Sequence, residues 1–158
     1  MKKNSTQTAA VAVPPPLLFL TCLGVAFFMN RMFPIDMPDL PGSVQIIAGG
    51  LFSAASAVFG LGALAVMASN KTPFNPAKQT LVVVKNGPFQ FSRNPMYLSL
   101  VLLMIGFTFF QSSLWYLGAT LVLFFLLTHL AIKPEEQYLA EKFGQQYLDY
   151  KARVRRWI

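Results

Sequence analysis

Long apolar runs separated by short polar connections dominate the chain. Four such runs are present, at about residues 17–33, 44–68, 96–110 and 114–132. A helix needs about 20 apolar residues to cross about 30 Å of hydrocarbon, and all but the third run reach or approach that length. Only Gln111–Ser113 separates the third run from the fourth, which predicts a tight antiparallel helical hairpin. The pattern therefore predicts an all-α integral membrane protein with about four transmembrane helices, in a single membrane domain covering residues 1–158.

Composition and charge placement support this interpretation. Hydrophobic residues make up 54% of the chain and charged residues 12%, about half of what soluble domains carry. With four spans, twelve of the 13 Lys and Arg residues fall on one side, which predicts cytoplasmic termini, a cytoplasmic connection at residues 69–95 and a cytoplasmic tail at 134–158. The net charge of +7 then reflects topology and attraction to anionic membrane lipid, and we expect no nucleic-acid partner.

The N-terminus has features of a secretory signal, because Lys2 and Lys3 precede the first apolar run. No small-residue cleavage site follows that run, so we expect a retained helix. The single cysteine, Cys22, lies inside the run and cannot form an internal disulfide.

Small residues recur at helical spacing in the second run, namely Gly49, Ser53 and Ala57, with Gly50 and Ala54 beside them. Such rows let helices approach closely in lipid. The row could pack within the chain or against partner helices, so a non-enzymatic membrane interaction module stays open as an alternative. A small transporter is less favoured, because the four runs contain no Asp or Glu.

The connection before the third run contains turn and strand signals. Leu81–Val84 and Phe89–Phe91 flank the turn pair Asn86-Gly87, which predicts a small β-hairpin at the membrane surface. Asn94-Pro95 then predicts the start of a helix, with Asn94 as N-cap and Pro95 at the first helical position.

Arg93 and Tyr97 flank this predicted helix start. Taken alone, Arg93 could be a membrane-surface anchor, Asn94 a cap and Tyr97 part of an aromatic belt.

The tail begins with Pro134-Glu135-Glu136, which predicts a new helix whose positive end suits two carboxylates. An amphipathic stripe follows, with a possible break at Gly144. Its members are Leu139, Phe143, Tyr147, Tyr150 and Val154. The only histidine, His129, precedes the two glutamates by one to two helical turns. Ionisable groups at membrane depth are often functional, although a lone histidine is as readily structural.

The predicted hairpin brings Arg93, His129, Glu135 and Glu136 to one end of the helices. An arginine and a helix N-terminus bind a carboxylate, and glutamates bind an ammonium group. Aromatic faces accept a sulfonium cation. The set therefore suits a zwitterionic ligand.

Two segments resemble a known family. "GPFQFSRNPMYLS" at 87–99 and "KPEEQYLAEKFGQQYLDYKARVRRWI" at 133–158 are similar to the isoprenylcysteine carboxyl methyltransferase and phospholipid methyltransferase family of integral membrane enzymes. The resemblance covers about residues 72–158. The matching residues are Arg93, Pro95, Tyr97, Glu135, Glu136, Leu139, Phe143, Gly144, Tyr147 and Tyr150. Asn94 departs from the pattern, because the family usually has histidine there and an amide cannot titrate.

The resemblance implies S-adenosyl-L-methionine as methyl donor, bound at the cytoplasmic ends of the last two helices beneath the tail. The cofactor-binding residues that we predict are Arg93, Asn94, Pro95, Tyr97, His129, Glu135, Glu136 and Leu139. Arg93 would take the carboxylate, and Glu135 or Glu136 the ammonium group or ribose. His129 and Tyr97 would shape the pocket.

The predicted catalytic residues are Arg93, His129 and Glu135. Methyl transfer from a sulfonium needs positioning and exclusion of water, and we predict no metal. A carboxylate or thiolate acceptor needs no base, whereas an ammonium acceptor would need His129 or a glutamate. Prenylated cysteine, a phospholipid amine, and a small thiol or hydrophobic acid all remain possible acceptors, and the oligomeric state stays open.

Overall fold

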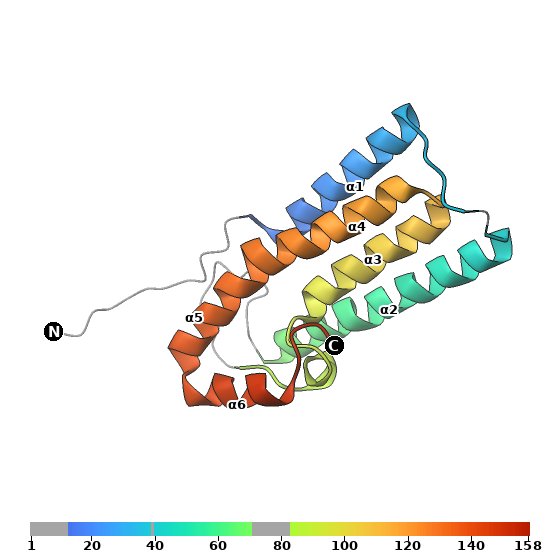
Figure 1. The fold of residues 1–158 in the computed structure, drawn as a ribbon. Coiled ribbons are helices and arrows are strands. Elements are labelled where there is room, and N and C mark those ends of the chain that lie inside the picture. Colours follow the sequence, from blue (N-terminus) through green and yellow to red (C-terminus); the bar gives the residue numbers. More distant parts are fainter. Residues whose placement is uncertain (1–12, 39, 71–82) are drawn as a thin grey trace.

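The structure, a computed structural model, describes residues 13–38, 40–70 and 83–158, and this part of the chain is helical (Figure 1). Its elements are α1 (Pro15–Met32), α2 (Gly42–Ser69), the 3₁₀-helix η1 (Gly87–Gln90), α3 (Pro95–Gln111), α4 (Leu114–Leu126), the π-helical segment η2 (Leu127–Ile132), α5 (Lys133–Phe143) and α6 (Gln145–Arg153). Three helices are long and apolar enough to cross a membrane: α1, α2 and the continuous helix Leu114–Phe143. α3 is a shorter apolar helix of 17 residues. The predicted all-α fold is confirmed, with three to four long apolar candidate spans where about four were predicted. Lys2 and Lys3, which suggested a secretory signal, lie outside the described residues.

The four apolar helices lie side by side in the order α1, α4, α3, α2 (Figure 1). α3 and α4 form the predicted antiparallel hairpin, joined by Ser112 and Ser113 alone. Ser112 adopts the left-handed conformation with φ 44°, and Ser113 caps α4 by accepting a hydrogen bond from the Trp115 amide at 3.2 Å. This short turn fixes the ends of α3 and α4 next to each other.

Small residues allow α2 to approach α3 closely. A Cβ atom added to Gly106 of α3 would lie 2.7 Å from Ser53 Oγ and 3.2 Å from the Gly49 carbonyl oxygen. The Ser56 hydroxyl donates a 2.7 Å hydrogen bond to the Ser99 carbonyl across the same contact. Gly49 and Ser53 of the predicted small-residue row therefore pack within the chain, whereas Gly50, Ala54 and Ala57 of the same row are exposed.

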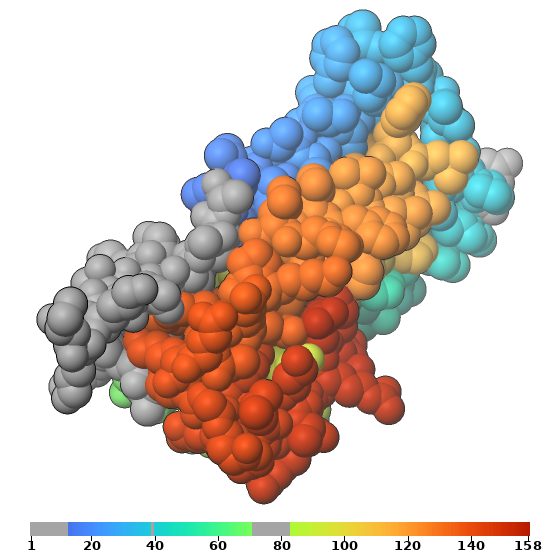
Figure 2. All heavy atoms as spheres, turned by 60° about the vertical axis from the view of Figure 1, so that its left-hand side comes forward, coloured from blue at the N-terminus to red at the C-terminus, as the bar shows by residue number. Residues whose placement is uncertain are grey.

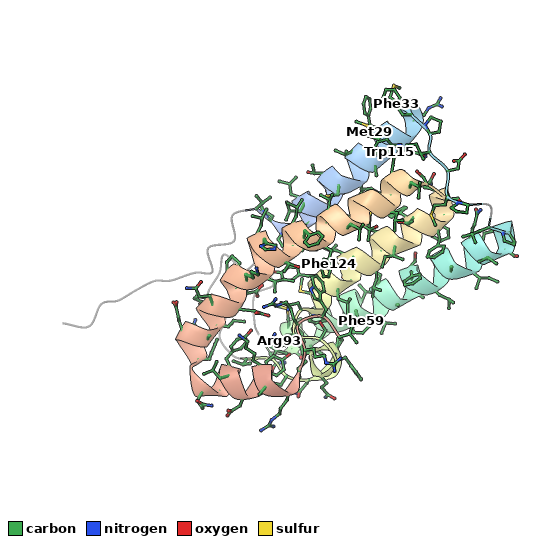
Figure 3. All side chains as sticks on the ribbon, in the orientation of Figure 1. Met29, Phe33, Phe59, Arg93, Trp115 and Phe124 are labelled. Carbon is green, nitrogen blue, oxygen red and sulfur yellow. The ribbon has the colours of Figure 1, made fainter. Side chains whose placement is uncertain are left out.

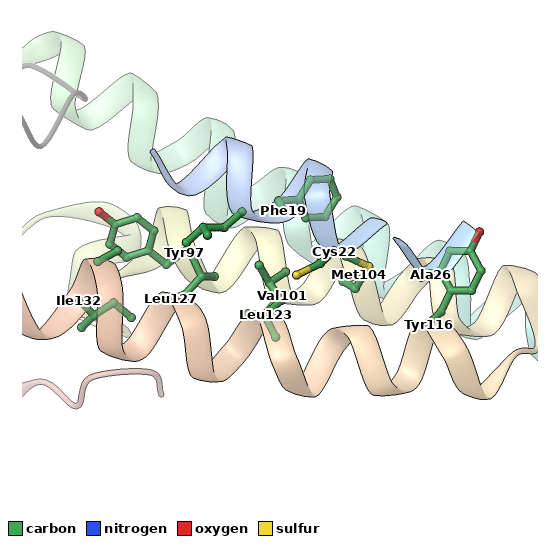
Figure 4. Close-up of a cluster of buried hydrophobic side chains, with 12 residues drawn as sticks. Phe19, Cys22, Ala26, Tyr97, Val101, Met104, Tyr116, Leu123, Leu127 and Ile132 are labelled. Carbon is green, nitrogen blue, oxygen red and sulfur yellow. The ribbon is translucent and has the colours of Figure 1, made fainter. Parts of the chain in front are cut away.

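The buried core lies where α1, α3 and α4 meet and continues into η2 (Figure 4). Met104, Leu123, Leu127 and Ile132 are fully buried in it. Large apolar side chains elsewhere on α1, α2 and α4 are exposed, as expected for surfaces that face lipid. The core thus ends at Tyr97 and Ile132, next to the charged residues described below.

Two predicted features are wrong. No new helix begins at Pro134, because the helix that starts at Leu114 continues through it to Phe143. The amide of Lys133 bonds to the Thr128 carbonyl five residues earlier, and this widened turn accommodates a proline, which has no N–H to donate. Glu135 and Glu136 therefore have no free helix N-terminus.

The predicted β-hairpin is replaced by η1 over its described part, because Pro88 cannot donate a strand hydrogen bond. Leu81 and Val82 lie outside the described residues.

The predicted break at Gly144 is confirmed. Gly144 has φ 51° and ψ −128°, a conformation that favours glycine, and it separates α5 from α6. The turn sends α6 back across the end of the helices, as Figure 1 shows.

Candidate active site at the charged end of the helices

The end of the helices where α3 begins carries the buried charges of the described structure, and we call it the charged end. α3 begins at Pro95, as predicted, and Arg93 lies two residues earlier. Asn94 is the N-cap residue of α3, as predicted, but its side chain makes no capping hydrogen bond to the helix. Its amide instead donates a 3.0 Å hydrogen bond to the Arg156 carbonyl, and the Ser92 hydroxyl donates to the same oxygen at 3.3 Å. The start of α3 is therefore bound to the C-terminal end of the chain.

The last five described residues, Val154–Ile158, form an irregular segment that we call the C-terminal strap. The Arg93 amide donates to the Arg155 carbonyl at 3.0 Å, and the Trp157 ring stacks on Phe124 with centroids 4.7 Å apart. In Figure 2 only a small yellow-green area remains visible between the orange and red atoms of the C-terminal half. The strap and α6 thus cover the loop that carries Arg93.

Three charged side chains meet beneath this cover. Glu136 Oε1 lies 3.2 Å from Arg93 Nη2, and both side chains are only 7% exposed. Arg156 forms a two-point contact with the same carboxylate, from Nε to Oε1 at 3.0 Å and from Nη2 to Oε2 at 2.8 Å. Figure 3 shows Arg93 at this end, far from the α3–α4 turn. Glu136 therefore contacts two guanidinium groups, one from the loop before α3 and one from the C-terminal strap.

Arg93 keeps unused hydrogen-bonding capacity. Among the described residues, its Nε and Nη1 atoms are buried and make no hydrogen bond of good geometry, although the Tyr147 hydroxyl lies close enough to interact with the Arg93 guanidinium. A buried donor without a partner costs about 1–3 kcal/mol, and more when it is charged. These two nitrogens are thus suited to bind an anionic group of a ligand, and a carboxylate fits them.

Glu135 contacts a different partner. The Tyr97 hydroxyl donates a 2.6 Å hydrogen bond to Glu135 Oε2, which joins the first turn of α3 to α5. The two adjacent glutamates thus have different partners: two arginines bind Glu136, whereas one neutral hydroxyl donates to Glu135.

Two tyrosines of α6 line the cluster, and their rings pack edge to face 6.3 Å apart. The pKa of Tyr147 is raised to about 12, chiefly by burial and also by the nearby Glu136, against the opposing effect of Arg93. Burial also raises the pKa of Tyr150, whose hydroxyl donates to the Phe89 carbonyl at 2.6 Å. Both hydroxyls are therefore neutral at physiological pH, while the hydrogen bonds that Arg156 donates to Glu136 raise the pKa of Arg156 and keep it charged.

The structure brings Arg93, Asn94, Pro95, Tyr97, Glu135 and Glu136 together, but it leaves His129 out. His129 is exposed, with Nδ1 3.3 Å from Lys133 Nζ on the outer surface of the helix. Among the described residues, His129 makes no hydrogen bond or ion pair with Arg93, Glu135 or Glu136, so its place in the site stays a prediction; η2, which carries it, has more residues per turn than the α-helix from which the spacing was judged. Leu139 is partly buried on α5.

Sequence reasoning missed Ser92 and Arg156. Arg155 and Arg156 are adjacent and chemically identical, yet Arg155 is exposed and Arg156 turns inward to Glu136. The strap has no helical period from which this difference could be read.

Comparison with known proteins decides the family. A family model described as phospholipid methyltransferase matches residues 44–146, about two thirds of the chain. The chain belongs to this family. Members of the phospholipid methyltransferase family are methyltransferases that use S-adenosylmethionine.

A relative in Haemophilus influenzae is described only as an uncharacterized protein. It is 41% identical over 64 residues, which is 40% of this chain and the whole of the relative. No solved structure matches the chain. The family match ends at residue 146, so most of α6 and the entire strap lie beyond it.

Proposed function

We propose that this protein is an integral membrane methyltransferase that uses S-adenosylmethionine and acts on a lipophilic or small acceptor at the cytoplasmic membrane face. Family membership supports the reaction class, and the long apolar helices support the membrane location. The excess of Lys and Arg on one side of the predicted spans supports the cytoplasmic face. A carboxylate, thiol or amine acceptor is compatible with the proposal.

The observation that carries the proposal is the pair of buried, unpartnered nitrogens on Arg93. They would bind the carboxylate of the cofactor's amino-acid part through charge-assisted hydrogen bonds. Glu135 would bind its ammonium group, because Glu136 is already held by Arg93 and Arg156. The residues at the charged end thus fit both charges of an amino acid.

Methyl transfer requires few further catalytic groups from the protein. When bound, the cofactor supplies a methyl group that its sulfonium charge has already activated. The chain's own residues hold the reactants in line and exclude water, and the strap and α6 cover the loop at Arg93. An amine acceptor must lose a proton to a base before the transfer, whereas a carboxylate or thiolate acceptor needs none.

A titration of the purified protein in detergent with S-adenosylmethionine tests the proposal. The wild-type protein should show saturable binding, and Arg93→Ala should weaken it by about tenfold or more, because charge-assisted hydrogen bonds are lost. Arg153→Ala is the matched control, since its side chain is exposed at the end of α6. Absence of binding by the wild-type protein, or equal binding by Arg93→Ala, would contradict the proposal.

Labelled methyl donor then identifies the acceptor. Transfer of label to a prenylated cysteine, a phospholipid amine, a small thiol or a hydrophobic acid would each select one acceptor class. Transfer to none of them, despite tight binding of the donor, would contradict the assignment of acceptor classes.

A further inference from the structure

Arg156 occupies a position that the family match does not cover, and it contacts the central carboxylate of the charged end. We propose that Arg156 is a positioning residue: it holds Glu136 so that this carboxylate binds one nitrogen of Arg93 and leaves the other two for a ligand carboxylate. The proposal rests on the proposed function and deepens it, because it assigns part of the cofactor site to the C-terminal strap.

The geometry at Glu136 shows how Arg156 can determine which nitrogens of Arg93 remain free for a ligand. Arg156 reaches both carboxylate oxygens, at 3.0 and 2.8 Å, and this two-point contact fixes the plane of the carboxylate. Arg93 meets the same group at one oxygen only, with Nη2 3.2 Å from Oε1. Without Arg156, Glu136 would be free to rotate and form a two-point contact with Arg93 itself. Arg93 would then have fewer donors left for a ligand.

The difference in burial between the two arginines decides which of them gains more from contact with Glu136. The Arg93 side chain is 7% exposed, so its unpartnered nitrogens are shielded from water, whereas the Arg156 side chain is 35% exposed. A buried guanidinium gains more from each additional acceptor than an exposed one does. Removal of Arg156 would therefore draw Glu136 towards Arg93.

The strap holds Arg156 in place through its backbone. The Arg156 carbonyl accepts hydrogen bonds from Ser92 and from Asn94, the residues on either side of Arg93. Trp157 stacks on Phe124 of α4 immediately afterwards. The loop that carries Arg93 and the strap that carries Arg156 are thus joined by one small set of hydrogen bonds.

Two ligands separate positioning from general structural support. Full-length protein in detergent is titrated with S-adenosylmethionine and with the decarboxylated form of the same compound, which lacks the group that Arg93 would bind. Arg156→Ala should weaken binding of the first by about tenfold and leave binding of the second within about twofold. Arg156→Lys should give an intermediate loss, since it keeps the charge but not the two-point contact. Arg153→Ala should match the wild type.

A double-mutant cycle then shows whether Arg156 acts through Glu136. In a Glu136→Gln background, Arg156→Ala should have little further effect on S-adenosylmethionine affinity. A full additional loss would mean that Arg156 contacts the ligand directly and would overturn positioning. Equal losses for both ligands would indicate a structural role only and would also overturn it, and Arg156→Lys guards against misfolding of the alanine variant.

The two proposals fail in different ways. If the wild-type protein binds neither ligand, the proposed function fails and this inference fails with it. If the wild-type protein prefers the carboxylate-bearing ligand and Arg156→Ala keeps that preference, only the positioning role is wrong.

Discussion

The two ends of the helical layer are held together by different means. At the end opposite the charges, which we call the turn end, backbone groups join the segment after α1 to the α3–α4 turn. The Met37 amide donates to the Ser112 carbonyl at 2.8 Å, and the Leu114 amide donates to the Ile35 carbonyl at 2.9 Å. The Trp115 indole adds a 2.6 Å bond to the Phe33 carbonyl, and Figure 3 shows these two residues close together. These contacts at the turn end join neutral groups.

The charged end is held by ionised side chains. Glu136 binds Arg93 and Arg156, Glu135 accepts from Tyr97, and two nitrogens of Arg93 have no partner among the described residues. The unpartnered buried atom on α1, Asn30 Oδ1, is by contrast a neutral acceptor. A neutral hydrogen-bonded end needs nothing further to be stable, whereas a buried cation with free donors is a costly arrangement that a ligand would complete.

The difference between the ends predicts that Glu136→Ala has the largest effect on stability. The substitution leaves buried Arg93 without its counter-charge, and breaking a buried ion pair costs about 3–5 kcal/mol. Because Arg156 is partly exposed, we expect about 3 kcal/mol, measured as a loss of unfolding free energy in detergent.

Glu141→Ala is the matched control for this prediction. Glu141 lies on the same helix, is exposed and contacts only Gln137 at 3.2 Å among the described residues, so its removal should cost less than about 0.5 kcal/mol. Similar losses for the two variants would mean that the buried charges do not stabilise this end.

The sequence predicts most of the framework that places these charges. The short Gln111–Ser113 connection predicts the α3–α4 hairpin, Asn94-Pro95 predicts the start of α3, and Gly144 predicts the break before α6. Each is a local signal, because a connection length, a proline or a glycine restricts the backbone whatever surrounds it. Local signals also placed Arg93 and the two glutamates at the same end.

The parts that the sequence did not predict depend on distant contacts. The inward turn of Arg156 is fixed by Ser92 and Asn94, far away in the chain, and nothing in "VRRW" distinguishes it from Arg155. The outward position of His129 follows from the widened turn of η2, which a 3.6-residue period does not foresee. The lack of a hairpin at η1 follows from Pro88, whose effect was outweighed by the Asn86-Gly87 turn signal.

Tyr97→Phe sharpens the comparison within the charged end, because it removes one hydrogen bond to a carboxylate without removing a charge. The 2.6 Å bond to Glu135 Oε2 is lost, and hydrogen bonds to charged groups contribute about 1.5–3 kcal/mol. We expect a loss of about 2 kcal/mol in unfolding free energy. Tyr138→Phe is the matched control, since its hydroxyl contacts Lys142 near the surface and should contribute little. Equal losses would show that Glu135 gains no special stability from α3.

Trp115→Phe makes the smallest change and tests the turn end alone. It removes the indole N–H that donates to the Phe33 carbonyl while keeping an aromatic ring, so we expect a loss of about 1 kcal/mol in unfolding free energy. Because the Trp115 indole contacts a neutral carbonyl at the end opposite the charged end, the affinity for S-adenosylmethionine should stay at the wild-type value in the same detergent. A clear loss of affinity would mean that the turn end influences the charged end through the length of α3 and α4, and the two ends could then no longer be treated as independent.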